Sequence, residues 1–148
     1  MTTIAYKDGV LASDSGVFYG DYLVGETEKI WRVGDILVGA VGTAGFARKF
    51  LDWVRSGNRC WDKTPGPDDI PENGTAFIIF DGKIREWDYG CRNGPSLEIT
   101  SPFKAWGSGS AVALGAMAAG ASAEEAVRIA IQYDVSSAGA VQVLRAGE

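Results

Sequence analysis

Three turn dipeptides, each set between two strand-like runs, place the strongest constraint on how this chain folds. Asp8-Gly9, Gly34-Asp35 and Asp81-Gly82 suit the positive φ angles of a two-residue β-turn. The runs beside them are rich in the β-branched and aromatic residues that favour strands. Each dipeptide therefore predicts a hairpin, and the chain is expected to be built on antiparallel sheets.

A helix is predicted over residues 44–56, between the second and the third hairpin. Thr43 is a suitable N-cap, because its hydroxyl can accept a hydrogen bond from the first helical turn. Phe46, Phe50 and Trp53 recur at helical spacing and form one apolar stripe for docking on a sheet.

Two further helices are predicted near the end of the chain, followed by a strand over residues 140–145. Residues 110–119 are apolar on nearly all sides, which predicts a helix sandwiched closely between neighbours. Residues 122–133 begin with a capping box, whereas residues 16–25 are expected to form a loop or an irregular extended segment. This order of elements predicts the α+β class, with two stacked antiparallel sheets and helices outside each, in one domain spanning residues 1–148.

The composition is that of a globular protein and excludes several functional classes. Apolar residues make up 46% of the chain and charged residues 22%, so a packed core is expected. The net charge of −5 gives no general attraction for nucleic acid or for an anionic membrane. No apolar run approaches the roughly 20 residues of a membrane-spanning helix, and no signal-peptide pattern begins the chain. Cytoplasmic residence is the default expectation.

The chain contains no histidine. This excludes Ser-His-Asp and Cys-His catalytic arrangements and every zinc site that uses histidine, and no metal or cofactor is expected. Among the remaining bases, an α-amino group, with an unperturbed pKa of about 7.7–8.0, is best matched to neutral pH. Cys60 and Cys91 are expected to be two thiols in a reducing compartment, with a disulfide or a reactive thiol as the alternative.

The register of the first hairpin suggests a candidate nucleophile. It places Thr3 opposite Asp14 and Thr2 opposite Ser15. A methionine that precedes a small residue is usually removed, so loss of Met1 alone is expected to expose the amine of Thr2. We therefore predict that the Thr2 hydroxyl is a nucleophile and that its own amine is the base.

Lys29 and Gly42 extend this candidate site. Lys29 is predicted to lie in a strand over residues 28–33, and its ammonium would lower the pKa of the Thr2 amine while Asp14 holds it in position. The alternative is a solvated lysine at a sheet edge and a carboxylate in a turn. Gly42 stands between a strand and a helix, where its N–H could face a developing oxyanion; the alternative is an ordinary tight turn.

Two glycine- and serine-rich segments carry weaker signals. Residues 107–110 fit neither a dinucleotide fingerprint, because Val112 replaces the third glycine, nor a nucleophile elbow, because Trp106 replaces the first. A turn leading into a helix is the simplest interpretation. Residues 134–139 are typical of a helix-to-strand turn.

Six short motifs, in this order and context, cover nearly the whole chain. They are Thr2-Thr3-Ile4, Ala12-Ser13-Asp14, Glu28-Lys29-Ile30, Val41-Gly42-Thr43, Gly107-Ser108-Gly109 and Asp134-x-x-Ser137-x-Gly139. Together they resemble the proteasome β-subunit and HslV family of N-terminal threonine peptidases. The resemblance implies the four-layer α-β-β-α sandwich of N-terminal nucleophile hydrolases and a threonine-type endopeptidase.

The resemblance also implies a role for each site residue. Thr2 forms the acyl-enzyme, Lys29 and Asp14 tune its reactivity, and the Gly42 N–H stabilises the oxyanion. The groups that surround the Thr2 amine and its water are Ser108, Asp134 and Ser137. The residues that line the primary specificity pocket are Val17, Thr27, Trp31, Ala40 and Ala44.

Partners follow from the same resemblance. It implies peptide or unfolded-protein substrates and a homo-oligomeric ring, and it leaves room for an ATP-dependent unfoldase partner. A Pro-rich loop over residues 62–74 stands where the family usually has a second helix, as in compact members from bacteria and their phages. Two alternatives stay open: an N-terminal nucleophile amidase acting on a small amide, and a ring-forming structural or assembly protein whose catalytic residues are relics.

Overall fold

The computed structural model describes residues 2–57, 74–89 and 97–148. The chain divides into two compact units, which are described separately below. The first unit comprises Met1–Ile30 and Ser101–Glu148, so it is built from both ends of the chain, and the second comprises Trp31–Thr100. A single domain over residues 1–148 remains a prediction.

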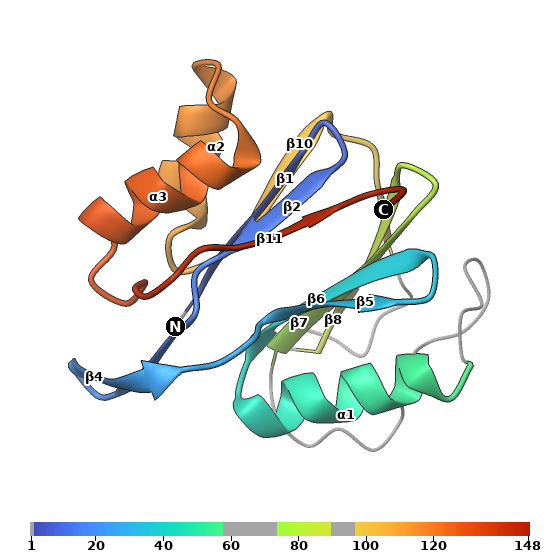
Figure 1. Cartoon of the computed structure of the whole chain (residues 1–148), viewed down its shortest axis with the longest axis horizontal. Coiled ribbons are helices and arrows are strands. Elements are labelled where there is room, and N and C mark those ends of the chain that lie inside the picture. Colours follow the sequence, from blue (N-terminus) through green and yellow to red (C-terminus); the bar gives the residue numbers. More distant parts are fainter. Residues whose placement is uncertain (1, 58–73, 90–96) are drawn as a thin grey trace. The chain divides into compact units, whose positions relative to one another are not determined.

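The first unit is built on a four-stranded antiparallel sheet (Figure 1). Its strands, in spatial order, are β10 (Phe103–Gly107), β1 (Thr3–Lys7), β2 (Val10–Ser13) and β11 (Gln142–Arg145). The hairpin between β1 and β2 forms as predicted: Lys7 pairs with Val10. Asp8 and Gly9 have φ angles of 52° and 77°, as a turn with two left-handed residues requires.

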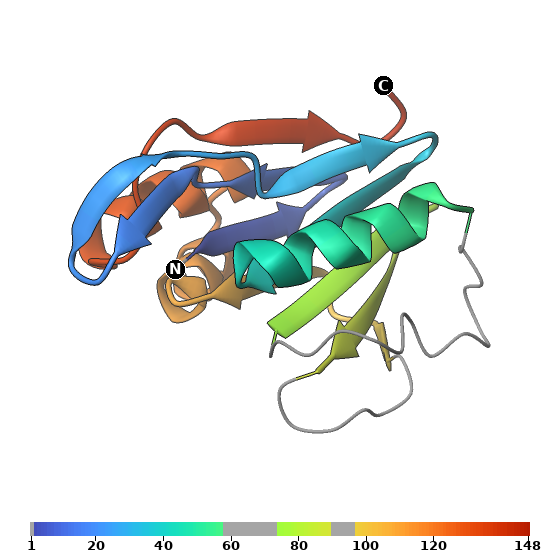
Figure 2. The ribbon, with the colours of Figure 1, turned by 90° about the horizontal axis from the view of Figure 1, so that it is seen from below.

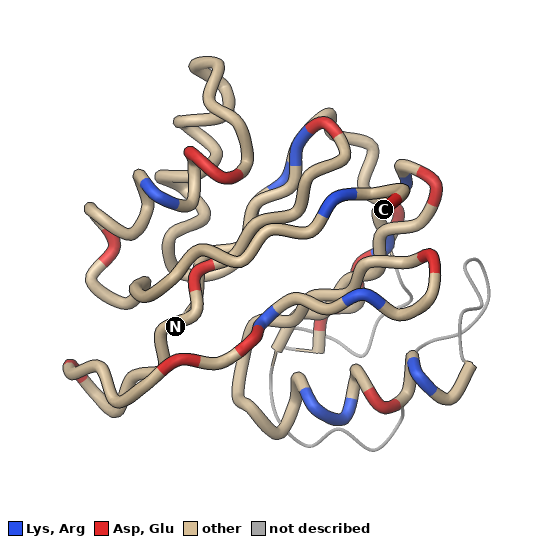
Figure 3. The backbone as a smooth tube through the Cα atoms, viewed as in Figure 1, with Lys and Arg blue, Asp and Glu red and all other residues tan. Residues whose placement is uncertain are grey.

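Helices α2 (Ser110–Ala118) and α3 (Ala123–Tyr133) pack against this sheet through small apolar side chains. The capping box of α3 is confirmed, since Ser122 and Glu125 each accept a backbone hydrogen bond from the other. Helix α2, predicted to be sandwiched closely between neighbours, packs against α3, β10 and β1. Only one face is buried, through Ala113 and Met117, although the helix carries no charged residue (Figure 3).

The segment over residues 16–25, predicted as a loop or an irregular extended segment, forms a second hairpin of the first unit. Strands β3 (Gly16–Tyr19) and β4 (Tyr22–Glu26) form a two-stranded sheet with an irregularity between Val17 and Phe18. All of β4 is exposed. Because neither face of β4 is buried, this strand lacks the apolar alternation by which strands are recognised.

The second unit is a five-stranded antiparallel sheet covered by one helix. The strands, in spatial order, are β5 (Ile30–Val33), β6 (Ile36–Gly42), β7 (Gly74–Phe80), β8 (Lys83–Asp88) and β9 (Leu97–Ile99). Helix α1 (Ala44–Arg55) packs on β6 and β7 (Figure 2). Its predicted N-cap is confirmed: the Phe46 N–H donates to Thr43 Oγ1 at 3.1 Å.

Aromatic side chains form a cluster within the mainly aliphatic core between α1 and its sheet. Phe46 and Phe50 are fully buried, as the predicted stripe requires, and Trp53 is partly buried against the same core. The Phe50 ring lies 5.4 Å from the Trp53 ring and 5.3 Å from the Trp87 ring, between centroids. Such tilted contacts add stability beyond the apolar area that they bury.

Some predictions fall on residues outside the described part of the chain. Cys60, Cys91 and the loop over residues 62–74, apart from Gly74 in β7, belong to this group. Among the described residues, no three or more His, Cys, Asp or Glu side chains are grouped as metal ligands would be. No helix of the described residues has the length and apolar character needed to cross a membrane.

Candidate active site

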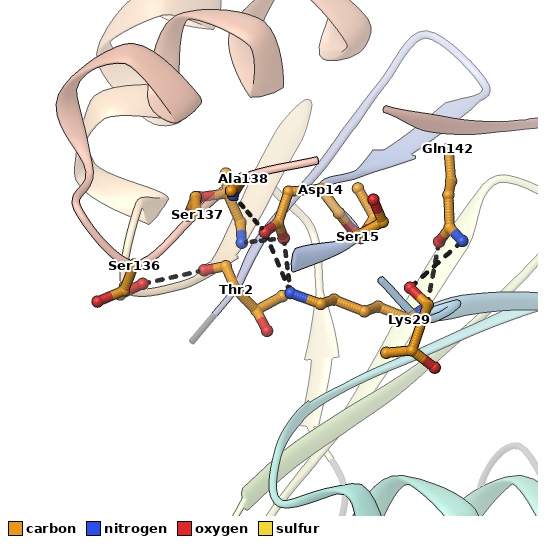
Figure 4. Close-up of polar contacts among 12 residues, drawn as sticks. Thr2, Asp14, Ser15, Lys29, Ser136, Ser137, Ala138 and Gln142 are labelled. Atoms are coloured by element: carbon orange, nitrogen blue, oxygen red, sulfur yellow. Dashed lines mark hydrogen bonds and ion pairs between the residues drawn. The ribbon is translucent and has the colours of Figure 1, made fainter. Parts of the chain in front are cut away.

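A fully buried carboxylate, that of Asp14, stands at the centre of the candidate site (Figure 4). Lys29 Nζ donates to both of its oxygens, at 3.0 and 3.1 Å. The backbone N–H groups of Thr3 and Ala138 donate to Oδ1 and Oδ2, at 2.9 and 3.0 Å. Each of these four hydrogen bonds therefore comes from a donor that is charged or fixed by the backbone.

The first hairpin delivers Asp14 to this position. Asp14 follows the last residue of β2, and its N–H donates to the carbonyl of Thr3 at 3.0 Å, which confirms the predicted Thr3–Asp14 pairing. The predicted pairing of Thr2 with Ser15 is wrong. Ser15 N–H instead donates to the Ala138 carbonyl at 3.0 Å, so the chain turns away from β1 after Asp14.

Lys29 lies just before β5, not in the middle of a strand as predicted. Its side chain is buried against Asp14, and that burial lowers its pKa below the usual value of a lysine. The charge and hydrogen bonds of Asp14, and then the charge of Asp134, act in the opposite direction but do not cancel the effect. Lys29 therefore releases its proton more readily than an exposed lysine.

A second carboxylate, Asp134, lies at the C-cap of α3. An anion is disfavoured at the negative end of a helix, so this position needs donors to stabilise it. Ser108 Oγ donates to Oδ2 at 2.7 Å, Ser137 Oγ donates to the same oxygen, and the Ser136 N–H donates to Oδ1 at 3.4 Å. Partial burial raises the pKa of Asp134, but these hydrogen bonds outweigh it and lower the pKa overall.

The hydrogen bonds around Ser137 have a definite direction. Its single hydroxyl proton is donated to the Asp134 carboxylate in a hydrogen bond, so Ser137 Oγ must accept a hydrogen bond from the Thr3 hydroxyl, 2.7 Å away. The Thr3 hydroxyl therefore donates to Ser137, Ser137 donates to Asp134, and the Asp134 carboxylate is the final acceptor. This chain of hydroxyls runs beside the first strand, one residue away from Thr2.

Thr2 is 8% exposed, and Figure 4 shows it next to Asp14 and Lys29. Its carbonyl accepts hydrogen bonds from Ser108 Oγ at 3.3 Å and from the Gly109 N–H at 3.4 Å. The close approach depends on glycine, because a Cβ at Gly107 would lie 2.0 Å from the Thr2 carbonyl oxygen. The turn at residues 107–109 thus holds the strand that presents Thr2.

Two residues that the sequence did not single out, Glu26 and Gln142, also contribute hydrogen bonds around this site. Glu26 Oε1 accepts hydrogen bonds from Ser15 Oγ at 3.0 Å and from the Ala140 N–H at 2.6 Å. These bonds, that of Ala140 first, lower the pKa of Glu26. The side chain of Gln142 bonds to the segment that carries Lys29. Neither residue forms a motif with its sequence neighbours, so no local pattern reveals it.

The remaining predicted site residues keep their roles only as predictions. Gly42 ends β6 with a φ of 141°, a region that favours glycine, and Thr43 caps the helix that follows. Residues of the predicted specificity pocket fall in both units: the first unit contains Val17 and Thr27, and the second contains Trp31, Ala40 and Ala44. Within the second unit, Ala40 is buried in the core beneath α1, and Trp31 packs partly buried against that core.

The chain was compared with known proteins at three levels. No family model matches it, and no curated protein matches it. Solved structures do match. Thiobacillus denitrificans BPH, solved in complex with epoxomicin, is 23% identical with a TM-score of 0.64 over 99% of each chain. Another structure of Thiobacillus denitrificans BPH is 26% identical, with a TM-score of 0.62, over 99% of this chain and 98% of that one. Eukaryotic HslV from Trypanosoma brucei is 18% identical, with a TM-score of 0.68, over 97% and 98%.

These matches extend over almost the entire length of both chains, so they concern the whole fold. The protein has the α+β fold of N-terminal nucleophile hydrolases, and the predicted fold class is confirmed. Within that class, its structural neighbours are HslV and proteasome-type peptidases, and the resemblance found in the sequence is confirmed.

Proposed function

We propose that this protein is a threonine-type endopeptidase whose nucleophile is the hydroxyl of Thr2 after removal of Met1. The observation that carries the proposal is the buried Asp14–Lys29 ion pair at the end of the strand that presents Thr2. Burying two charges costs free energy unless they are well paired. A protein in which both are replaced by apolar residues is often no less stable. A buried ion pair next to a potential nucleophile therefore indicates that the pair serves catalysis rather than stability.

In the proposed reaction, the Thr2 oxygen bonds to the scissile carbonyl carbon while its proton passes to the Thr2 amine. The Gly42 N–H is assigned to the developing oxyanion, as the resemblance implies. The amine then gives the proton to the leaving nitrogen, the C–N bond breaks, and an ester remains on Thr2. Water attacks this ester with the same amine as base and restores the hydroxyl.

Asp14 with Lys29, and Asp134 with its serines, are proposed to support different parts of this cycle. Lys29 is proposed to act on the Thr2 amine by its charge, keeping the amine neutral and able to accept the hydroxyl proton. Ser108, Asp134 and Ser137 are proposed to hold the amine and the attacking water and to pass protons between them. Peptide or unfolded-protein substrates and a homo-oligomeric ring, with or without an unfoldase partner, belong to the same proposal.

Covalent labelling provides the test. Intact mass of the purified protein should show that Met1 is absent, and incubation with epoxomicin should add one inhibitor mass, located on Thr2 by peptide mapping. Thr2→Ala should lose both the adduct and the hydrolysis of fluorogenic peptides. Thr3→Ser is the matched control, since it alters the neighbouring threonine and keeps a hydroxyl.

Four outcomes would contradict the proposal. A retained Met1 in a protein that still hydrolyses peptides, or a Thr2→Ala variant with unchanged activity, would remove Thr2 as nucleophile. Hydrolysis of small amides with indifference to peptides would favour the amidase. A free Thr2 amine without adduct or hydrolysis would favour a structural or assembly protein.

A further inference from the structure

One side chain, that of Gln142, connects the last strand to the segment that carries Lys29 (Figure 4). Its Oε1 accepts the Lys29 backbone N–H at 3.0 Å, and its Nε2 donates to the Thr27 carbonyl at 3.5 Å. The amide thus bonds to one donor and one acceptor two residues apart. Only a primary amide of this length satisfies both, because a carboxylate has no donor and a thioether has no donor and only a weak acceptor.

The segment held in this way lies outside regular secondary structure. Residues 27–29 lie between β4 and β5 and belong to neither strand. The Thr27 N–H donates to the Ser15 carbonyl at 2.8 Å at the start of the segment, and the Gln142 amide bonds to the Lys29 N–H at its end. The amide of Gln142 therefore supplies at residues 27–29 the hydrogen bonds that a neighbouring strand supplies to a strand in a sheet.

Gln142 also has a fixed relation to Asp14. In the ladder between β11 and β2, Gln142 pairs with Ser13, the residue before Asp14. Backbone pairing thus places Gln142 next to Asp14 along the sheet, and the Gln142 side chain bonds to the backbone of Lys29. The position of Lys29 Nζ, 3.0 Å from Asp14 Oδ1, is set by both ends of this connection.

A reciprocal contact strengthens the connection. Glu26, just before the segment, accepts the N–H of Ala140, two residues before Gln142. The stretches 26–29 and 140–142 therefore each receive a side-chain hydrogen bond from the other. Gly139 allows them to approach, because a Cβ there would lie 2.5 Å from Glu26 Oε1.

We propose that Gln142 is a positioning residue, which holds Lys29 on Asp14 through the Lys29 N–H and the Thr27 carbonyl and so controls how fast Thr2 reacts. The inference rests on the proposed function, because it needs Thr2 to be the nucleophile. Gln142 acts through Lys29 and has no assigned contact with substrate. Its loss should therefore slow the chemical step and leave inhibitor binding unchanged.

The test measures epoxomicin labelling of Thr2 in the full chain, with kinact and KI determined separately. Gln142→Met keeps the length of the side chain and removes both hydrogen bonds, and should lower kinact about tenfold at constant KI, as loss of an ordinary positioning hydrogen bond would. Gln142→Glu keeps the acceptor for the Lys29 N–H, and should fall between Gln142→Met and the wild type. Gln132→Met is the control, since Gln132 is the only other glutamine and lies exposed on α3.

The outcomes separate this inference from the function on which it rests. A wild-type protein labelled on Thr2, together with an unchanged kinact in Gln142→Met, would overturn the inference alone. A rise in KI with constant kinact, or no recovery in Gln142→Glu relative to Gln142→Met, would also overturn it, because either result indicates a general structural role. A wild-type protein that is never labelled would overturn the proposed function and the inference with it.

Discussion

The two carboxylates near Thr2, Asp14 and Asp134, are held in opposite ways. Asp14 is completely buried, and its partners are one ammonium group and two backbone N–H groups. Asp134 is partly exposed, and its partners are two serine hydroxyls and one backbone N–H. The first set of donors has a fixed direction, whereas the hydroxyls of the second can rotate, donate and accept.

This difference suggests how the proposed chemistry is divided. A buried carboxylate bound by fixed donors can hold a charge in one place, but it offers no path along which a proton moves. A carboxylate bound by hydroxyls can exchange the direction of its hydrogen bonds as a proton passes. We therefore expect changes at Asp14 and Lys29 to affect stability strongly, and changes at Asp134 and its serines to affect mainly activity.

The largest expected effect comes from removing the cation of the buried pair. Lys29→Met leaves the Asp14 charge buried without its ion partner, which should lower the free energy of unfolding by about 3–5 kcal/mol. Urea unfolding at pH 7 measures this loss of stability. Peptide hydrolysis should be lost as well, at temperatures where the variant stays folded.

An exposed ion pair provides the control for this prediction. Arg128 and Glu124 are also 3.0 Å apart but lie on the surface of α3, so Arg128→Met should cost less than about 1 kcal/mol. Adding Asp14→Asn to Lys29→Met should recover part of the stability and none of the activity. Equal losses for Lys29→Met and Arg128→Met would refute the description of Asp14 as a buried, charge-held carboxylate.

A smaller effect is expected at Asp134. Asp134→Asn keeps the shape and converts charge-assisted hydrogen bonds to neutral ones, which should lower the free energy of unfolding by about 1 kcal/mol at pH 7. Because the folded pKa of Asp134 lies below its ordinary value of 3.8, its stabilisation is present above that value. It is lost as the pH falls through the folded pKa.

Unfolding measured between pH 6 and pH 2.5 tests the sign. The wild type should lose stability more steeply than Asp134→Asn below the ordinary pKa, and the two curves should converge in acid. Peptide hydrolysis by Asp134→Asn should fall by more than the stability change suggests. A variant that is as active as the wild type would show that the hydroxyl network has no part in the reaction.

The parts of this molecule that the sequence predicts are those determined by local chemistry. The turn at Asp8-Gly9 fixes its own φ angles and, through them, the pairing that brings Asp14 to Thr3. The N-cap at Thr43 and the capping box at Ser122 are similarly local. Each depends on residues within a few positions, so a short stretch of sequence contains the information.

The parts that the sequence missed depend on contacts between distant segments. Gln142 lies 113 positions after Lys29, and nothing near either residue indicates their hydrogen bond. Glu26 accepts the N–H of Ala140 across a similar separation, 114 positions. The hairpin of β3 and β4 was missed for another reason: its exposed strand has no buried face to impose a pattern.

The smallest expected effect on stability, and the sharpest separation of the two kinds of role, is at Ser108. Its side chain is exposed and bonds to Asp134 and to the Thr2 carbonyl, so Ser108→Ala should change the free energy of unfolding by less than about 0.5 kcal/mol. If the hydroxyls near Asp134 move protons, peptide hydrolysis should still fall by about fivefold, the value of one modest hydrogen bond. Ser122→Ala gives the converse, since loss of that N-cap should cost about 1 kcal/mol and leave hydrolysis unchanged. If the two serine variants instead lost activity in proportion to their stability, the division between a charge-holding carboxylate and a proton-handling one would not stand.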